Sequence, residues 1–276
     1  MTVMTNSPTS ATPVLEVRDL EVTFGSGHSA AKVLKGVSAS IERGKTLGIV
    51  GESGSGKSTL AKAIVGLVGA SSGSISFNGS DLGRMTGAQR RAMRRAVQMI
   101  PQDPYSSLNP RRTIGQTLAE AIDPVKSNPR DHHEKISYWL STIRLDSDVA
   151  ERYPHEFSGG QRQRIAIARA LAVGPKLIIA DEITSALDLS VQAEILNLIS
   201  RLRTELDLTM AFISHDLDVV HHVSDEIMVL FHGEVVELGD VDSVYGSPKH
   251  PYTRRLIDSV PGGPGFNIGE RRAAVT

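Results

Sequence analysis

Cysteine is absent from the 276-residue chain, so the protein holds no disulfide, thiolate zinc site, iron–sulfur cluster or cysteine nucleophile. Long apolar runs are missing as well. The best of them, residues 177–180 and 227–231, have the length of strands and fall far short of the roughly 18 consecutive apolar residues that cross a bilayer. These absences predict a soluble protein that is cytoplasmic unless a partner holds it at a membrane.

The chain also lacks an excess of either charge. Thirty Lys and Arg residues face thirty-one Asp and Glu residues, which leaves a formal net charge of −1. A dedicated nucleic-acid-binding protein would usually be clearly basic, so we expect no nucleic acid among the partners. Arginines do gather between residues 84 and 95. A solvated helix face is expected there, with contact to a partner or to anionic lipid as the alternative.

Composition divides the chain into three parts. Residues 1–13 are rich in Thr, Ser and Pro and lack the basic start and the apolar stretch of a signal peptide, so they are predicted to form a disordered tail. Residues 14–245 are predicted to fold as one domain, with a helical subdomain at about 103–172. Residues 246–276 are predicted to be a C-terminal tail.

Segments with strand and helix character alternate through the middle part, which indicates an α/β fold with a helical insertion. Within the insertion, Ile136, Trp139, Leu140 and Ile143 recur at the spacing of one helix face. Strands are predicted at residues 14–24, 33–41, 46–50, 74–78, 97–100, 176–181, 208–214, 226–231 and 234–238. Helices are predicted at residues 60–67, 113–122, 131–145, 160–172 and 191–206.

The segment Gly51–Ser58 fits the pattern G-x-x-x-x-G-K-[ST] between a predicted strand and a predicted helix. Glycines at these positions let the backbone curl so that successive N–H groups point at phosphate oxygens. The Lys57 ammonium then serves the β- and γ-phosphates, and the Ser58 hydroxyl serves Mg²⁺. The residues expected to bind ATP in this segment are Gly51, Glu52, Ser53, Gly54, Ser55, Gly56, Lys57, Ser58 and Thr59.

An apolar strand, Leu177–Ala180, ends in the carboxylates Asp181 and Glu182. The end of a buried strand lies at the edge of the sheet where α/β proteins place their ligands. There Asp181 can hold Mg²⁺ or its water ligands, and Glu182 can polarise the attacking water. On its own such a strand end is common; downstream of a phosphate-binding loop it indicates a nucleotide hydrolase.

A second anion-binding pattern follows Phe157. Ser158, Gly159, Gly160 and Gln161 open a predicted helix, and backbone N–H groups at a helix start form a ready phosphate site. One triphosphate needs no second site of this kind in the same chain. The pattern therefore suggests a contact with a nucleotide held by another subunit.

Together these motifs resemble the ATP-binding subunit of an ABC transporter, over residues 14–239. Gly51–Ser58 is similar to the Walker A motif, Leu177–Glu182 to Walker B, and Ser158–Gln161 to the signature motif, with Phe157 where Leu is commoner. The remaining correspondences are Gln102 with the Q-loop glutamine, Ser185 to Asp188 with the D-loop, His215 with the switch histidine and Phe24 with the adenine-stacking aromatic.

The resemblance implies a P-loop NTPase core with a mixed sheet, an antiparallel β subdomain and an inserted α-helical signature subdomain. It implies ATP and Mg²⁺ as ligands, with the metal at Ser58, Gln102 and Asp181. Lys57, Glu182 and His215 would be the catalytic residues. The expected partners are a second ATPase subunit, identical or paralogous, two transmembrane permease subunits and, through them, an extracytoplasmic substrate-binding protein.

A narrower likeness concerns residues 102–111 and 247–256, which resemble the subfamily that serves oligopeptide, dipeptide and nickel uptake. The implied protein is a peripheral ATPase on the cytoplasmic face of the cell membrane that energises peptide import. A nickel or metal-chelate importer and a soluble ABC ATPase outside transport are the alternatives. The chain departs from the family at Ile183, where proline usually follows the glutamate, at Pro101, where an aromatic is common, and in lacking a C-terminal cysteine cluster.

Overall fold

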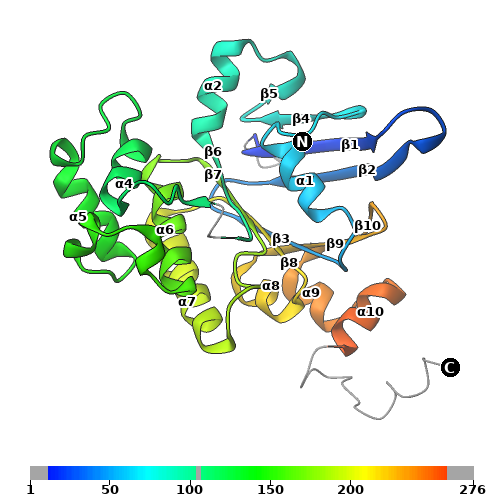
Figure 1. Cartoon of the computed structure of the whole chain (residues 1–276). Coiled ribbons are helices and arrows are strands. Elements are labelled where there is room, and N and C mark those ends of the chain that lie inside the picture. Colours follow the sequence, from blue (N-terminus) through cyan, green and yellow to red (C-terminus); the bar gives the residue numbers. More distant parts are fainter. Residues whose placement is uncertain (1–11, 104–106, 260–276) are drawn as a thin grey trace, which may run out of the picture.

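The computed structural model describes residues 12–103 and 107–259 (Figure 1). Most of the predicted N-terminal tail, and residues 260–276 of the predicted C-terminal tail, lie outside the described residues. Residues 104–106, within the stretch that resembles the peptide and nickel subfamily, do so as well.

An antiparallel sheet is built mainly from the N-terminal part of the chain. Its strand order is β2-β1-β4-β5. Buried and exposed positions alternate loosely along β1, as in a sheet with one face on the core and one in solvent. The strands are β1 (Leu15–Phe24), β2 (Ala31–Ile41), β4 (Ser72–Phe77) and β5 (Ser80–Asp81).

A second sheet has the order β10-β9-β3-β8-β7-β6, in which β10 is antiparallel to β9 and the other pairs are parallel. Every residue of β3, β7 and β8 is buried, which is why these strands read as continuous apolar runs. The strands are β3 (Thr46–Val50), β6 (Val97–Ile100), β7 (Leu177–Asp181), β8 (Met210–Ser214), β9 (Glu226–Phe231) and β10 (Glu234–Asp240).

Helices flank this sheet and form a separate helical region after β6, drawn in green in Figure 1. The α-helices are α1 (Lys57–Ile64), α2 (Gly87–Ala96), α4 (Ile114–Ile122), α5 (His133–Thr142), α6 (Gly159–Ala172), α7 (Leu189–Leu206), α8 (Leu217–Val223), α9 (Val241–Gly246) and α10 (Pro251–Asp258). Short 3₁₀ turns lie at Gly27–Ser29, Leu82–Arg84, Pro129–His132, Ser147–Glu151 and Pro154–Glu156.

The central sheet separates two hydrophobic cores. Along β7, Leu177 and Ile179 pack in the core that holds α1 and the antiparallel sheet. Ile178 and Ala180 face the other way, into the core that holds α6 and α7. Because successive side chains of a strand point to opposite faces, one short strand contributes to both layers and ends where they meet.

Most of the predicted elements are present. The strands 46–50, 97–100 and 226–231 are confirmed to the residue, and Ile136, Leu140 and Ile143 are buried as one face of the helical region. The predicted helix 60–67 is shifted, since α1 begins at Lys57 and Leu67 lies beyond its end, 74% exposed. The helix begins earlier because Lys57 and Ser58, the last two residues of the Gly51–Ser58 segment, already belong to its first turn.

The folded part of the chain extends past residue 245, where the sequence pattern places the start of a tail. Residue 245 falls inside α9, and the predicted tail contains α10. Tyr252 and Ile257 of α10 are buried in the same core as α6 and α7. The folded part therefore extends beyond residue 245, since α10 has an apolar face that the core covers.

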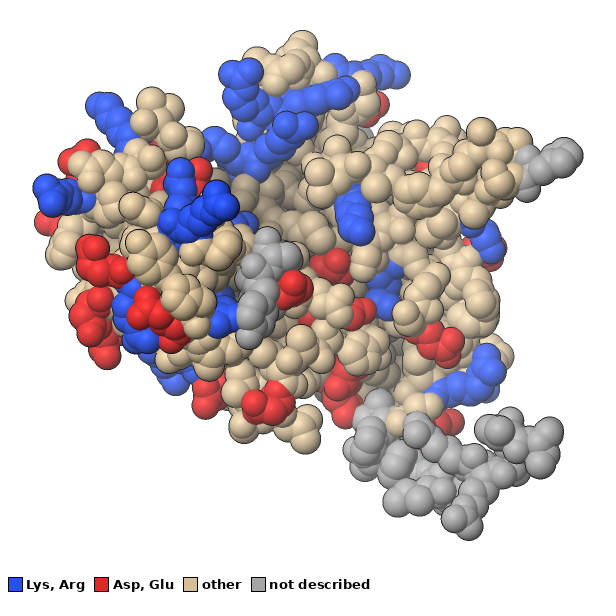
Figure 2. Space-filling model, viewed as in Figure 1, with Lys and Arg blue, Asp and Glu red and all other residues tan. Residues whose placement is uncertain are grey.

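The predicted arginine face is solvent-exposed. Arg90, Arg91, Arg94 and Arg95 of α2 are all exposed, together with Arg84 just before the helix. Figure 2 shows basic side chains gathered over this end of the molecule. Among the described residues, no helix is long and apolar enough to span a membrane.

Candidate functional site

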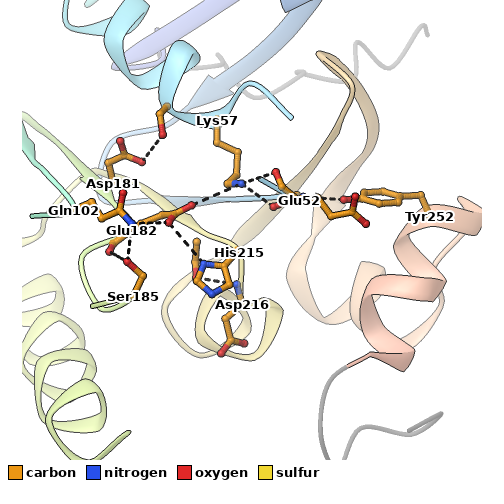
Figure 3. A network of polar contacts seen from close by, with 12 residues as sticks. Glu52, Lys57, Gln102, Asp181, Glu182, Ser185, His215, Asp216 and Tyr252 are labelled. Atoms are coloured by element: carbon orange, nitrogen blue, oxygen red, sulfur yellow. Dashed lines mark hydrogen bonds and ion pairs between the residues drawn. The ribbon is translucent and has the colours of Figure 1, made fainter. Parts of the chain in front are cut away.

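The loop between β3 and α1 curls around the side chain of Lys57. The Lys57 ammonium donates hydrogen bonds to the backbone oxygens of Gly51, at 2.7 Å, and Glu52, at 2.9 Å (Figure 3). A Cβ at residue 51 would lie 2.1 Å from the Leu230 carbonyl oxygen, so only glycine fits there. The loop residues Gly51, Ser55, Gly56 and Lys57 are buried, while Glu52, Ser53 and Gly54 are exposed and Ser58 and Thr59 are half-buried.

Two buried polar groups of this loop suit an anion. The Lys57 side chain is 4% exposed, and burial lowers its pKa although Glu182 and Asp181 act in the opposite direction. The Ser55 hydroxyl is buried, and within the described part of the chain it has no hydrogen-bond partner. A buried donor without a partner is costly, so an anionic ligand that accepted from it would be favoured.

Asp181 and Ser58 meet at the end of β7. The Ser58 hydroxyl donates to Asp181 Oδ1 over 3.3 Å. Burial raises the pKa of the Asp181 carboxyl, against the lowering effect of that hydrogen bond. The described residues contain no group of three or more His, Cys, Asp or Glu side chains arranged for a metal. The oxygens of Asp181, Ser58 and Gln102 fit Mg²⁺, which prefers oxygen ligands and takes few of them from protein.

Glu182 has a left-handed backbone, with φ of 49°. Such a conformation costs free energy in a residue other than glycine and clusters at functional sites. The carboxylate accepts a hydrogen bond from Gln102 Nε2, at 3.2 Å, and its Oε1 lies 3.8 Å from Lys57 Nζ. The Ser185 hydroxyl accepts from the same Gln102 amide, at 3.1 Å. Gln102, shortly after β6, and Lys57, the first residue of α1, therefore both contact the carboxylate that follows β7.

His215 completes this cluster from the end of β8. Its Nδ1 lies 3.7 Å from Glu182 Oε2, and its side chain is 57% exposed (Figure 3). The next residue, Asp216, accepts hydrogen bonds from the N–H groups of Asp218 and Val219 and so begins α8. Parallel strands end at the same edge of a sheet, so β7 and β8 bring Glu182 and His215 together.

The predicted signature segment forms the start of α6. The Ser158 hydroxyl accepts from the Gln161 N–H, and the Gln161 side chain accepts from the Ser158 N–H, which is a capping box. Ser158 is exposed. A Cβ at Gly160 would lie 2.4 Å from Val191 Cγ1, so close packing of α6 on α7 also requires glycine there. This helix belongs to the core on the other side of the sheet from α1.

Two further predicted residues stand apart from the Glu182 cluster. Phe24, at the end of β1, is 47% exposed and thus free to stack on a planar ligand. Asp188 accepts from the N–H of Val191 and the hydroxyl of Ser190 and caps α7. These hydrogen bonds hold the pKa of Asp188 below its usual range.

Sequence reasoning missed one contact of the phosphate-binding loop. Tyr252 of α10 reaches the loop, and its hydroxyl accepts from the Glu52 N–H over 2.8 Å. The only sequence signal was the likeness of residues 247–256 to the peptide and nickel subfamily, which carried no role for the tyrosine.

The chain is similar in sequence to known proteins. The sequence pattern described as "ABC transporter" matches residues 34–185. The oligopeptide transport ATP-binding protein OppF of Escherichia coli (strain K12) is 47% identical over 248 residues, covering 89% of this chain and 74% of that protein. The di/tripeptide transport ATP-binding protein DppF of Pseudomonas aeruginosa (strain UCBPP-PA14) is 46% identical over 255 residues, covering 90% and 79%.

Solved structures share the fold. The protein cbiO1 of Clostridium perfringens, part of the ABC transporter complex cbiONQ, superposes with a TM-score of 0.76 at 26% identity over 89% of this chain and 94% of that one. The ATP-binding cassette MJ0796, in a dimeric post-hydrolysis state bound to ADP and phosphate, gives 0.70 at 27% identity over 82% and 98%. The predicted fold, a mixed sheet with an antiparallel subdomain and an inserted helical subdomain, is thereby confirmed. The chain belongs to the ABC transporter family, as one of its ATP-binding proteins.

Proposed function

We propose that this chain binds and hydrolyses Mg-ATP at the Lys57–Glu182 cluster and thereby energises the import of short peptides. The observation that carries the hydrolytic part is the convergence of Gln102, Glu182 and His215 beside the buried ammonium of Lys57. Relatives whose names state peptide transport favour peptide as the cargo over nickel or a metal chelate.

The loop residues would hold the triphosphate. Lys57 carries the buried positive charge, Ser55 a buried hydroxyl without a partner among the described residues, and the loop backbone a set of N–H donors. The exposed ring of Phe24 would stack on the adenine. Ser58, Asp181 and Gln102 would hold Mg²⁺, which supplies charge neutralisation at the β- and γ-phosphates.

Glu182 is the proposed general base. Its carboxylate would accept a proton from the water whose oxygen attacks the γ-phosphorus, while the bond from that phosphorus to the bridging oxygen of ADP breaks. Gln102 orients the carboxylate through its hydrogen bond. The Ser185 hydroxyl accepts from the same Gln102 amide and so helps to hold Gln102 in place. His215, half-exposed beside Glu182, would contact the γ-phosphate once nucleotide is bound. Most of the catalysis is positioning and stabilisation of charge.

The signature segment is proposed to act on the nucleotide of a second ATPase subunit, identical or paralogous. In this chain Ser158 begins a helix that packs on the opposite side of the sheet from α1, so its exposed N-terminus is available to another molecule. Asp188 and Ser185 would lie at the same subunit contact. Two transmembrane permease subunits and an extracytoplasmic binding protein would complete an assembly that holds this chain peripherally at the cytoplasmic face of the membrane.

Growth and hydrolysis test the two parts separately. A strain that lacks this subunit and has no second peptide importer should fail to grow on di- or oligopeptides as the sole amino-acid source. The wild-type gene should restore growth, and Lys57→Ala should not. Normal growth of the deletion strain on peptides, with loss of uptake of another solute, would refute the cargo. Absence of Mg-ATP hydrolysis by the assembled transporter would refute the enzymatic assignment.

A further inference from the structure

Tyr252 has the largest fully buried side chain among the described residues, with 2% of its surface exposed. It lies in α10, 200 positions away from Glu52 along the chain. Its hydroxyl nevertheless accepts the Glu52 backbone N–H at 2.8 Å, and Figure 3 shows the ring directed at the loop. The C-terminal helix thus contacts the backbone of the phosphate-binding loop directly.

The ring is held from several sides. It packs on Phe231 of β9, with 4.1 Å between ring centroids, and the Arg255 guanidinium lies 5.9 Å from its centroid. Burial raises the pKa of the Tyr252 hydroxyl, which therefore stays protonated at neutral pH. A neutral, rigid acceptor in a fixed place suits the task of anchoring one backbone N–H.

The start of α10 is fixed as well. The Glu237 carboxylate of β10 accepts the N–H groups of Lys249, at 2.8 Å, and His250, at 3.1 Å. The His250 ring in turn accepts the Tyr252 N–H at 3.2 Å and caps the helix. A chain of hydrogen bonds therefore runs from the central sheet through the first turn of α10 to Tyr252.

The loop is anchored at a second point by the same part of the chain. The Gly233 N–H, in the turn between β9 and β10, donates to the Ser55 carbonyl oxygen at 3.0 Å. Glu52 and Ser55 are themselves joined, since the Ser55 N–H donates to the Glu52 oxygen at 3.2 Å. The curled segment from Glu52 to Ser55 is thus tied to β9, β10 and α10.

We propose that Tyr252 is a positioning residue that pre-organises the phosphate-binding loop. Through this residue, α10 supports the nucleotide site. The inference rests on the proposed binding of ATP. Loop N–H groups that already point inward need less ordering when phosphate binds, so the anchor strengthens binding without touching the nucleotide. It acts on the ground state, so it should change the affinity for ATP more than the rate of the chemical step.

Tyr252→Phe removes the hydroxyl and keeps the ring on Phe231. The purified chain should bind Mg-ATP about fivefold more weakly, as expected for the loss of one hydrogen bond. In the assembled transporter the KM for ATP should rise by a similar factor with kcat little changed. Backbone amides of residues 51–56 should exchange hydrogen faster in the variant, and the melting temperature should stay close to that of the wild type.

Tyr245→Phe is the matched control. Tyr245 lies in the neighbouring helix α9, and its hydroxyl donates to Asp218 at 2.7 Å rather than to the loop. The control loses one tyrosine hydroxyl and one hydrogen bond, and its affinity for ATP and its amide exchange at 51–56 should equal those of the wild type. Equal affinity in wild type and Tyr252→Phe, or equal weakening in both variants, would overturn the role of Tyr252.

The same titrations separate the inference from the function on which it rests. Lys57→Ala serves as the reference that lacks the phosphate-binding ammonium. Wild-type affinity no better than that of Lys57→Ala would refute the proposed ATP site itself. Clear binding by the wild type with an unchanged constant in Tyr252→Phe would refute only the anchor.

Discussion

Gln102 and Glu182 are joined by a hydrogen bond of 3.2 Å although 80 positions separate them along the chain. Gln102 follows β6 and Glu182 follows β7, and these two strands are neighbours in the central sheet. Glu182 also faces Lys57 and His215 across 3.8 and 3.7 Å. A movement of the Gln102 segment would therefore directly displace the carboxylate of the proposed general base.

Glu182→Gln should retain ATP binding and lose turnover. The amide keeps the shape of the carboxylate but cannot accept a proton from water, so hydrolysis should fall by roughly a hundredfold or more. The variant should accumulate an ATP-bound dimer, because closure is no longer resolved. Steady-state hydrolysis and size-exclusion chromatography with Mg-ATP measure both. Glu205→Gln, at a half-exposed ion pair with Arg201, is the control that should behave as the wild type.

Ser158→Arg should abolish hydrolysis while the affinity of the isolated chain for ATP stays unchanged. The phosphate-binding loop of the same chain is untouched, but the bulky cation blocks contact with the partner's nucleotide, and hydrolysis should fall by roughly a hundredfold or more. Ser141→Arg, on the exposed face of α5, is the control. Much weaker ATP binding by the monomeric Ser158→Arg variant would show that Ser158 acts within its own chain.

Phe24→Ala should weaken ATP binding and leave the dimer contact intact. Base–aromatic stacking contributes roughly 1–3 kcal/mol, so the dissociation constant should rise between about fivefold and about 150-fold. Fluorescence titration with a nucleotide analogue gives the constant. Tyr138→Ala removes another exposed aromatic ring, in α5, and should have no effect on binding. An unchanged constant for Phe24→Ala would assign the stacking to a different residue.

Glu237→Gln should make stability less dependent on pH. Burial raises the pKa of the Glu237 carboxyl, but its interactions with Lys249, Thr253 and His250, including the two backbone hydrogen bonds, together outweigh burial and hold the pKa below the ordinary 4.5. A lowered pKa in the folded state contributes stability above pH 4.5, which is lost as the pH falls through the folded value.

The melting temperature of Glu237→Gln should therefore lie below that of the wild type at pH 7, and the difference should shrink below about pH 4.5. Glu205→Gln, on the surface, should show no such trend. A difference between wild type and Glu237→Gln that stays constant from pH 7 to pH 3 would contradict the proposed ionic role of the carboxylate and leave only a packing effect.

Two departures from the family pattern are accommodated in the core. Ile183 is 1% exposed and belongs to the core of α6 and α7. Phe157, where leucine is commoner, is 4% exposed in the same core, and the Arg152 guanidinium lies 4.6 Å from its ring centroid. Both positions take an apolar side chain for packing, and neither change removes a functional group from the Lys57–Glu182 cluster.

The sequence by itself determined the local features of this protein. The curl of the loop at Gly51–Ser58, the apolar strand that ends in Asp181 and Glu182, and the capped start of α6 depend on residue types at short spacing. Such features can be predicted because steric and hydrogen-bonding rules act over a few neighbouring residues. The strands at 46–50 and 97–100 could be predicted in the same way, since each is a short segment of mostly apolar residues.

Only the tertiary structure decided which of these features meet. The order β10-β9-β3-β8-β7-β6 brings Gln102, Glu182 and His215 to one edge and sends α6 to the opposite face from α1. The contact of Tyr252 with Glu52 spans 200 positions. It brings α10, which lies in the predicted tail, against the loop that precedes α1. Strand order results from competition among all the strands and helices for burial, and no short pattern encodes that outcome.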